Sequence, residues 1–361
     1  MRYTILAATL LISVIGGPAA AEDDRTAHSH RTVTVMTQNV YHGVNAELYG
    51  VATATDLRDL MIKVAAVFNG YHTRDFPQRA AALAAEIDAA RPELIGLQEA
   101  VLVRTQAPAD GLATPAGTVA LDYVQLLLDA LAARGLQYEV LATSFGWDAE
   151  LPSALGIDVR HTDREVILAR ADLKRKHLKV SNIQAGHFAT TCVIPTRIGA
   201  IAIKRGWVSA DIKMRGTHFR LVSTHLDGDC PDPAIQTAQA TELLQGPGAT
   251  DLPVVFMGDF NSDPMTGATA AYGVLTGAGF TDAWDAAGVG PGFTCCQDSS
   301  LLNHDSLLNR RIDLVLLRGD FGVVGIDTVG DEPADRTSSG LWPSDHAGVV
   351  ATLTLRQGDD D

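Results

Sequence analysis

The 361-residue chain is acidic and moderately apolar: 46% of its residues are hydrophobic, 20% are charged, and its formal net charge is −15 with histidine neutral. This composition is that of a globular protein with a sizeable core, and the sequence contains no repeat and no long low-complexity tract. A protein that binds nucleic acid chiefly by neutralising phosphates is usually basic. The acidity therefore argues against tight, metal-free DNA binding, but it does not exclude a nuclease with a metal-loaded or locally positive cleft.

The N-terminus has the pattern of a secretory signal peptide over residues 1–21. Arg2 precedes an apolar run, Ile5–Ile15, and small residues follow just before an acidic stretch. A basic start, a short apolar segment and an A-x-A site are typical of exported proteins, and the run is too short to span a bilayer. We therefore expect cleavage after Ala21, a secreted protein without stable membrane insertion, and a flexible segment over 22–31.

The expected fold begins with an alternating strand over 32–40, after which helices and strands alternate. Hydrophobic spacing together with Gly and Pro stops predicts helices over 56–68, 78–90 and 121–133, and strands over 93–99 and 138–143. The helix over 56–68 has two interpretations. It is either a core-packing helix or, because it follows the strand that carries Asn39, a substrate-recognition insert.

The later part of the chain is richer in strands. Apolar runs predict strands over 166–169, 198–203, 207–213, 219–224, 254–259, 312–317 and 347–355, with helices over 235–244 and 266–276. No clear linker divides the chain. We therefore expect one large α/β domain over 32–356, in which two sheets pack face to face with helices outside, followed by an acidic tail at 357–361.

Residues 254–264 carry the clearest functional pattern. An apolar, β-branched run ends at Gly258, and Asp259 and Asn261 follow at once. Residues two apart on an extended chain project to the same side, so this stretch delivers a carboxylate and an amide to one edge of a sheet. The carboxylate can accept a proton, and the amide can hold a phosphoryl oxygen without adding charge. Taken alone, an Asx-rich turn is the simpler explanation.

Polar side chains stand next to apolar runs at several further places in the chain. These residues are Asn39, Glu99, His225, Asp313, Asp345 and His346. Any one of them is a weak signal, because a strand often ends in a polar residue. Their ordered recurrence is a strong signal of one shared site.

With these residues the sequence resembles the endonuclease/exonuclease/phosphatase superfamily. The matching motifs are Thr37-Gln38-Asn39, Leu97-Gln98-Glu99, Ser223-Thr224-His225-Leu226, Gly258-Asp259-Phe260-Asn261, Arg311-Ile312-Asp313 and Ser344-Asp345-His346. The resemblance runs from Val33 to Leu355. It implies a four-layer α/β sandwich, in which two packed mixed β-sheets are flanked by helices, and a metal-dependent phosphoric ester hydrolase with its site at one edge of the sheets.

The resemblance also implies a divalent metal. Glu99 would be its main ligand, assisted by Asn39 and Asp345. A hard ion such as Mg²⁺, with Mn²⁺ or Ca²⁺ as alternatives, suits carboxylate and amide oxygens and offsets charge on phosphoryl oxygens.

The catalytic roles are likewise implied by the resemblance. Asp259 would orient or deprotonate the attacking water, and Asn261 would hold a phosphate oxygen. His346, oriented by Asp313, would act as a general base or as a hydrogen-bond donor in the transition state. His225 would bind the scissile phosphate or protonate the leaving oxygen.

Asp163 has two interpretations. It precedes a predicted strand at the place where pancreatic-type deoxyribonucleases carry an acidic residue that orients the first histidine, so it could pair with His225. Alternatively, it is a solvent-exposed loop charge beside Arg164. The sequence also departs from apurinic endonucleases, because no counterpart of their tyrosine near the scissile phosphate can be placed, and this argues against abasic-site repair.

Export makes disulfides possible for the cysteines of this chain. Cys192, Cys230, Cys295 and Cys296 allow three complete pairings. The first two lie near the ends of consecutive strand-like stretches, which favours their pairing, but Cys295 and Cys296 could instead each take one of them. No C-x-x-C spacing supports a metal site, so structural bridges are the better interpretation.

The substrate stays open, because members of such families share a core and differ in their loops. A secreted nuclease, slightly favoured, predicts positive charge around the cleft, with Lys204, Arg205, Lys213 and Arg215 as candidates. A phospholipid phosphodiesterase of sphingomyelinase type predicts an exposed apolar element, with the 56–68 helix and Trp207 as candidates. A phosphomonoesterase is a further alternative, and a non-catalytic binding protein is the least favoured. We expect a monomer that acts on a phosphodiester of nucleic acid or of a phospholipid headgroup.

Overall fold

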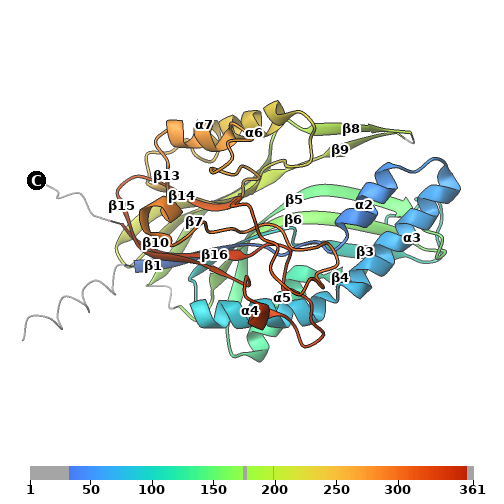
Figure 1. Ribbon diagram of the computed structural model, residues 1–361, viewed down its shortest axis with the longest axis horizontal. Coiled ribbons are helices and arrows are strands. Elements are labelled where there is room, and N and C mark those ends of the chain that lie inside the picture. The colour runs from blue at the N-terminus through green and yellow to red at the C-terminus, as the bar shows by residue number, and fades with distance from the viewer. Residues whose placement is uncertain (1–31, 174–176, 198, 356–361) are drawn as a thin grey trace, which may run out of the picture.

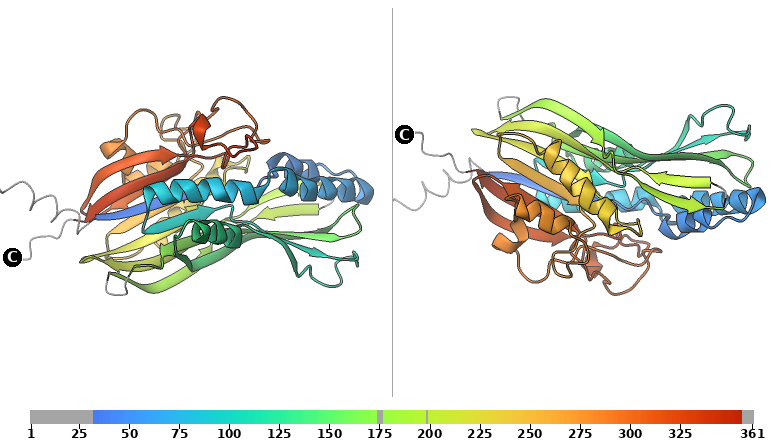
Figure 2. Two further views of the ribbon diagram at one scale, coloured as in Figure 1. Left: turned by 90° about the horizontal axis from the view of Figure 1, so that it is seen from below. Right: turned by 90° about the horizontal axis from the view of Figure 1, so that it is seen from above.

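The computed structural model describes residues 32–355 except 174–176 and 198. The described residues form two large β-sheets packed face to face, with helices on both outer faces (Figures 1 and 2). The predicted four-layer α/β sandwich is therefore confirmed. The expected signal peptide, the segment 22–31 and the tail 357–361 lie outside the described residues. Within these residues, no helix combines the length and apolarity needed to cross a bilayer.

The first sheet has the strand order β15-β16-β1-β2-β6-β3-β4, with β5 paired to β6. Its strands are β1 (Thr32–Asn39), β2 (Leu94–Gln98), β3 (Leu102–Gln106), β4 (Thr118–Asp122), β5 (Tyr138–Pro152), β6 (Asp158–Arg170), β15 (Phe321–Val329) and β16 (Gly348–Leu355). Strands β1 and β2 run parallel, with Asn39 opposite Gln98. Their C-terminal ends therefore meet, and Asn39 comes to lie beside Glu99.

The second sheet has the order β13-β14-β12-β11-β10-β7. Its strands are β7 (Leu178–His187), β10 (Gly206–Met214), β11 (Thr217–His225), β12 (Val254–Asp259), β13 (Thr281–Asp282) and β14 (Asp313–Arg318), and a separate hairpin joins β8 (Cys192–Thr196) to β9 (Gly199–Ile203). In the register of this sheet, Asp259 lies opposite His225 on one side and Asp313 on the other. Three of the predicted site residues thus share one sheet edge.

Gly258 allows β12 and β11 to approach closely just before this edge. Its φ of 150° lies in a region that L side chains rarely adopt. A Cβ atom at this position would also overlap the backbone of Thr224. The glycine that ends the apolar run is therefore required by the pairing that sets Asp259 beside His225.

Three hydrophobic layers follow from the alternation of side chains along the strands. Helices α2 (Asn45–Ala52), α3 (Leu57–Thr73), α4 (Phe76–Ala90) and α5 (Tyr123–Ala133) pack on the outer face of the first sheet, and α6 (Pro233–Gln245) and α7 (Ala271–Gly277) on that of the second. Two short elements, α8 (Ala283–Ala287) and the 3₁₀ turn η1 (Pro333–Asp335), lie in the C-terminal part. On β1, Met36 faces the helices while Val33 and Val35 face the second sheet.

The helix predicted over 56–68 is α3, and it is longer than expected. The side chain of Asp56 caps it by accepting the backbone N–H of Asp59, and the helix continues to Thr73. It buries Leu60 and Val64 in the layer between the helices and the first sheet. The core-packing interpretation is therefore the correct one for this helix.

Other boundaries also differ from expectation. The helix predicted over 266–276 begins only at Ala271, because the preceding residues form a turn in which the Ser262 and Thr269 hydroxyls are 2.7 Å apart. Trp207, expected as a possible exposed apolar element, packs partly against the core under α6 and α7. Helix α2 and strand β8 were not predicted, whereas β9 matches the strand expected over 198–203, and these elements build the pocket described below.

The cysteines pair within the described chain. A disulfide joins Cys192 to Cys230, whose Cα atoms are 5.7 Å apart, as favoured from the sequence. It ties the β8–β9 hairpin to the loop that follows β11. Cys295 and Cys296 pair with each other, so the alternative in which each takes one of the other cysteines is wrong.

Candidate active site

The polar residues predicted from the sequence converge at the edge where β1, β2, β11 and β12 end. All but the half-buried Asn261 are less than a tenth exposed: Asn39, Glu99, Asp163, His225, Asp259, Asp313, Asp345 and His346. Buried ionisable groups are costly unless they are paired or bind an ion. Such a concentration at one sheet edge is therefore the mark of a functional site.

Asn39 connects the two sheets at this edge. Its Nδ2 donates to Glu99 Oε1 at 3.2 Å and to Asp259 Oδ2 at 3.1 Å. Its Oδ1 accepts the backbone N–H of Tyr41 at 2.9 Å. One amide thus places the carboxylate of the first sheet beside that of the second, and its predicted role as a metal ligand stays a prediction.

Glu99 is held as a carboxylate in an uncommon backbone conformation. Its φ is 56°, a left-handed value that non-glycine residues adopt mainly at turns and functional sites. Its Oε2 accepts the backbone N–H of His42 at 2.9 Å and lies 3.5 Å from the His42 imidazole. Burial opposes ionisation, but His42 and the guanidinium of Arg205 outweigh it and lower the pKa of Glu99.

The carboxylates around Glu99 fit a hard divalent cation. Asp345 Oδ1 is buried and has no hydrogen-bond partner among the described residues. Burial, with the charges of Glu99 and Asp259, raises the pKa of Asp345 to about 7. A bound cation relieves such crowding of carboxylates, and oxygen donors are what Mg²⁺ prefers.

Asp259 is poised to exchange a proton. Burial and the nearby Asp313 carboxylate raise its pKa to about 7. Its Oδ1 accepts the backbone N–H of Asn261 at 2.8 Å, which holds the side chain in place. A carboxylate with a pKa near neutrality is suited to general-base catalysis.

His346 and Asp313 form a buried pair. His346 Nδ1 lies 2.7 Å from Asp313 Oδ2, and His346 Nε2 lies 3.9 Å from Asp259 Oδ2. Burial alone would lower the pKa of His346, but the charge and hydrogen bond of Asp313, with Asp345 and Asp259, raise it well above its ordinary value. The imidazole is therefore a cation that directs an Nε2–H group into the site.

His225 is the opposite case. Burial and the adjacent Arg205 lower its pKa well below the ordinary value, so the ring is neutral. Arg205 Nη1 is 3.0 Å from His225 Nδ1. A guanidinium can only donate, so Nδ1 accepts and the ring proton resides on Nε2. That nitrogen lies at the centre of the site, 3.4 Å from Asp259 Oδ2, which can accept its proton. It also lies 3.2 Å from Asn261 Nδ2, and because both nitrogens are donors in this tautomer, this contact is not a hydrogen bond.

Asp163 reaches His225 through Arg205. It lies within β6 and is 4% exposed, so the interpretation as an exposed loop charge is wrong. Its Oδ2 is 3.5 Å from Arg205 Nη1, the same nitrogen that contacts His225. A carboxylate oxygen of Asp163 also lies within 4.8 Å of a His225 ring nitrogen. The structure therefore brings the two residues together, with Arg205 between them.

Three contributors to the site had not been assigned this place from the sequence. His42 follows Asn39 closely and contacts Glu99. Arg205 had been named only as one of four candidate cations around a nucleic-acid cleft, and it contacts His225. Glu165 is fully buried with its Oε1 3.9 Å from His225 Nδ1. His42 stands three residues after Asn39, just beyond the end of β1, which is a usable signal. Nothing in the local sequence marks the other two.

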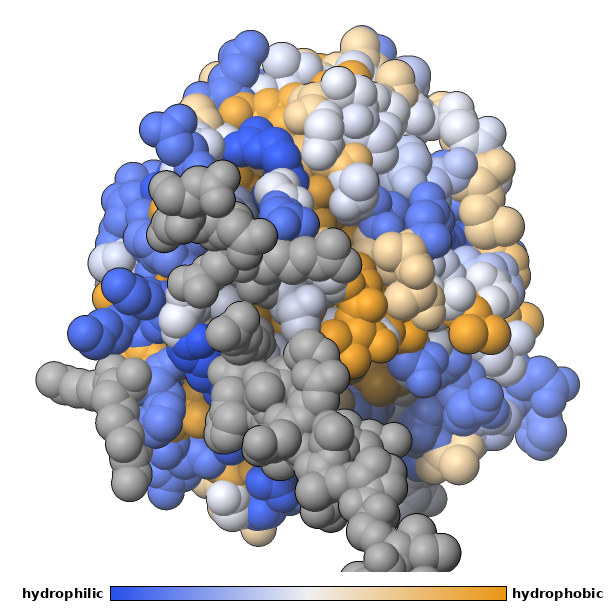
Figure 3. Space-filling view, turned by 90° about the vertical axis from the view of Figure 1, so that its left-hand side faces the viewer, coloured by the Kyte–Doolittle hydropathy of each residue, from blue (hydrophilic) through white to orange (hydrophobic). Residues whose placement is uncertain are grey.

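Two of the four cations proposed for a nucleic-acid cleft lie elsewhere. Arg215 Nη1 donates to the carbonyl oxygen of Thr32 at the start of β1, whereas Asn39 ends that strand roughly 23 Å away. Lys213 lies opposite His218 in the register of β10 and β11, near the C-terminal end of β10. Figure 3 views this end, where hydrophilic and hydrophobic residues intermix. For Lys213 and Arg215 the expectation of a place at the cleft is wrong.

The family follows from a comparison of sequence profiles. The profile of the Endonuclease/Exonuclease/phosphatase family matches residues 36–346, a range that contains every site residue described above. The chain belongs to this family. Its members are phosphoric ester hydrolases, typically dependent on a divalent metal, and so this protein is a phosphoric ester hydrolase. A comparison with curated protein sequences finds no significant match.

Solved structures of this family share the fold. A family protein from Bacteroides thetaiotaomicron has a TM-score of 0.56 and 15% identity, covering 90% of this chain and 98% of its own. A humanized D. rerio TDP2 has a TM-score of 0.54 and 18% identity, covering 90% and 99%. A mannosyl-6-phosphatase from B. thetaiotaomicron has a TM-score of 0.53 and 15% identity, covering 90% and 100%. At these identities the likeness concerns the fold alone.

Proposed function

We propose that this chain is an exported, divalent-metal-dependent hydrolase of phosphodiesters. The observation that carries the proposal is that two histidines of opposite protonation state flank the side chain of Asp259. On one side stands the cationic His346, and on the other the neutral His225, with the ionised Glu99 next to them. Groups whose environments drive their pKa values apart are those that divide acid and base roles.

In the proposed reaction the acidic residues bind the metal ion and activate water, and the histidines donate hydrogen bonds. Glu99 and Asp345, with Asn39, would hold the divalent ion, which neutralises charge on the phosphoryl oxygens when bound. Asp259 would take the proton of the attacking water, while the Nε2–H groups of His225 and His346 would donate to phosphoryl or leaving oxygens whose negative charge grows.

A diester suits the charge of this site better than a monoester. A phosphodiester carries one negative charge at neutral pH, whereas a monoester carries up to two. Glu99, Asp259 and Asp345 already crowd the site, and Arg205 is engaged with Asp163 and Asp229. A phosphomonoesterase is the second candidate, supported by the likeness to a mannosyl-6-phosphatase.

Nucleic acid is one possible diester for this enzyme. Its support is the likeness to D. rerio TDP2, for which a complex with a single-strand DNA product is known, at a TM-score of 0.52. Lys213 and Arg215 lie at the other end of the sheet from the site, which weighs against an extended basic surface for nucleic acid. A phospholipid headgroup is the other possible diester.

Hydrolysis of bis(p-nitrophenyl) phosphate by the mature protein tests the proposal. It is measured with Mg²⁺, Mn²⁺, Ca²⁺ or EDTA, beside p-nitrophenyl phosphate, plasmid DNA and sphingomyelin. We expect diester hydrolysis that needs a divalent ion and is lost in Glu99→Ala. Faster hydrolysis of the monoester would favour the second candidate, and no metal-dependent hydrolysis of any substrate would refute the proposal.

We also propose export and a monomeric state. The signal-peptide pattern supports export, and the Cys192–Cys230 bridge is typical of an oxidising compartment. Expression of the full chain in a secreting host, followed by intact mass and size-exclusion chromatography, tests both. A protein retained inside the cell with residues 1–21 attached would refute export, and a dimeric elution would refute the monomer.

A further inference from the structure

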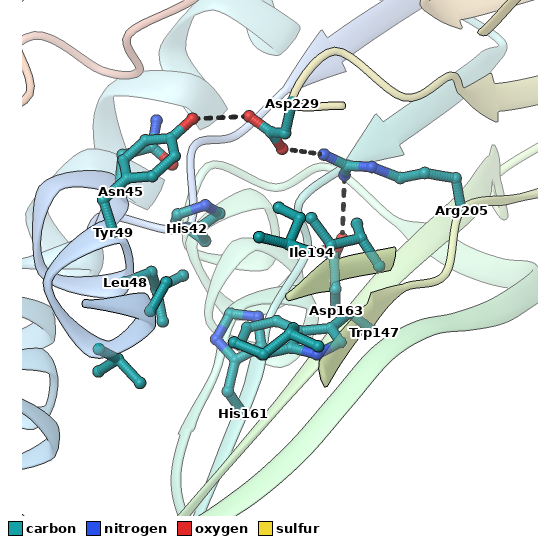
Figure 4. A pocket seen from close by; sticks show the side chains of 14 residues that line it. His42, Asn45, Leu48, Tyr49, Trp147, His161, Asp163, Ile194, Arg205 and Asp229 are labelled. Atoms are coloured by element: carbon teal, nitrogen blue, oxygen red, sulfur yellow. Dashed lines mark hydrogen bonds and ion pairs between the residues drawn. The ribbon is translucent and has the colours of Figure 1, made fainter. Parts of the chain in front are cut away.

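An apolar pocket opens beside the proposed phosphoryl site (Figure 4). Helix α2, strands β5 and β6, and the β8–β9 hairpin enclose a volume of about 110 Å³. Its apolar lining includes Leu48, Val51, Trp147, Ile194, Ile201 and Ile203. Helix α2 and the β8–β9 hairpin therefore supply most of its wall, although of these elements only β9 matches a strand expected from the sequence.

The pocket shares His42, Asp163 and Arg205 with the site and its immediate surroundings. His42 lines the pocket and donates its backbone N–H to Glu99, and Arg205 lines it and contacts His225. A group bound in the pocket would thus contact two residues that themselves contact Glu99 and His225. This is where the alcohol part of a phosphate ester would lie if its phosphoryl group were held at the site.

The polar groups at the rim are paired with one another, and of the Arg205 guanidinium only Nε has no hydrogen-bond partner among the described residues. Tyr49 donates its hydroxyl to Asp229 at 2.8 Å, Asp229 lies 3.1 Å from Arg205, and Arg205 lies 3.5 Å from Asp163, as the dashed lines of Figure 4 show. Groups paired in this way do not need a hydrogen bond from a ligand. The pocket therefore selects by shape and apolar contact.

The volume of the pocket and the aromatic side chains that line it indicate which apolar group fits. An engineered cavity of about 150 Å³ holds one benzene molecule, so this half-open pocket accommodates about one ring. Trp147 lies against His161 with their centroids 5.0 Å apart, and both line the pocket. Aromatic groups pack favourably against such rings.

We infer that this pocket binds a single aromatic ring carried by the alcohol that is esterified to the substrate phosphate. The inference rests on the proposed function, because the phosphoryl group must be held at Glu99, His225 and Asn261 for the ring to enter. It names the substrate class as compact aryl phosphoesters. A long basic track for nucleic acid is not required by such a substrate.

Calorimetric binding of two phosphonates in the presence of Mg²⁺ tests the inference. Methylphosphonate and phenylphosphonate share the anionic group and differ in the ring. We expect the wild-type protein to bind phenylphosphonate at least about tenfold more tightly, a conservative fraction of the gain for burying a ring. In Ile194→Asp the preference should fall to near unity, with methylphosphonate binding unchanged.

The hairpin offers a matched control. Val193 precedes Ile194 on β8, is 56% exposed and projects to the opposite face, so Val193→Asp places the same charge outside the pocket and should keep the preference. Ala52→Phe fills the pocket without a charge and should abolish the preference as well. This second variant keeps the test valid if Ile194→Asp does not fold.

The outcomes separate the inference from the proposed function. Equal binding of the two phosphonates, no binding of either, or a preference that survives both pocket variants would overturn the inference. Hydrolysis of bis(p-nitrophenyl) phosphate is followed separately, and its absence with every metal would overturn the proposed function. An enzyme that hydrolyses the diester without a ring preference would overturn the pocket assignment alone.

Discussion

Replacing Asp313 by Asn tests the role of the cationic His346. The substitution keeps the shape of the side chain but removes the charge that lies 2.7 Å from His346 Nδ1. A buried hydrogen bond to a charged group contributes about 1.5–3 kcal/mol. If it acts fully in the transition state, its loss lowers kcat by about 10- to 150-fold, since each 1.36 kcal/mol is tenfold in rate.

The pH profile distinguishes this role from a structural one. Asp313 helps to raise the pKa of His346, so the imidazolium is fully present at low pH and is lost, with the activity that needs it, as the pH rises through that pKa. Removing the carboxylate lowers the pKa, and the basic limb of kcat moves to lower pH. We would measure kcat for bis(p-nitrophenyl) phosphate at saturating Mg²⁺ across the pH range.

A second buried aspartate supplies the control for this experiment. Asp282 on β13 is paired with Arg311 and accepts the backbone N–H of Trp284, so Asp282→Asn removes a buried charge that does not contact His346. It should lower thermal stability and leave the basic limb in place. A basic limb in Asp313→Asn that coincides with wild type, at unchanged kcat, would refute the assigned role.

Three further predictions concern the metal, the histidine at β11 and the hairpin bridge. Glu99→Ala should abolish hydrolysis at any Mg²⁺ concentration while circular dichroism stays native, and full activity would overturn the site assignment. Asp163→Asn weakens the anchoring of Arg205 on His225 and should reduce kcat more than KM, whereas unchanged kinetics would remove Asp163 from the site. Replacing Cys192 and Cys230 together by Ser opens a loop spanning 38 residues and should cost about 4 kcal/mol of unfolding free energy in the chain-entropy description. Unfolding in urea would measure this cost, and an unchanged midpoint would contradict it.

The sequence sufficed for the site residues that end buried strands. Asn39, His225 and Asp259 each close an apolar run whose alternation sets both the strand and the side on which the last side chain projects. Parallel pairing then brings such ends to one edge without any further information. For these residues, the local sequence pattern is enough to predict the position in the fold.

The parts that could not be predicted depend on contacts between distant segments. Arg205 directly precedes β10 and reaches His225 because β10 pairs with β11. Its charge alone did not distinguish it from Lys213, which lies near the C-terminal end of β10. Helix α2 buries only Val51 fully, so it lacks a broad apolar stripe. The β8–β9 hairpin is half exposed, and its place is set by the Cys192–Cys230 bridge and not by burial.

The charge balance of the site links the fold to the chemistry. Two cations, His346 and Arg205, face the carboxylates of Glu99, Asp259, Asp313 and Asp345, and the histidine is charged only because the carboxylates surround it. The excess of negative charge is too deeply buried to be screened by solvent. A divalent ion would neutralise this excess and lower the pKa of Asp259, which would then enter the reaction as a carboxylate able to accept the proton of water. The same buried acidity that destabilises this sheet edge thus makes the edge selective for a cation and competent for hydrolysis once the cation is bound.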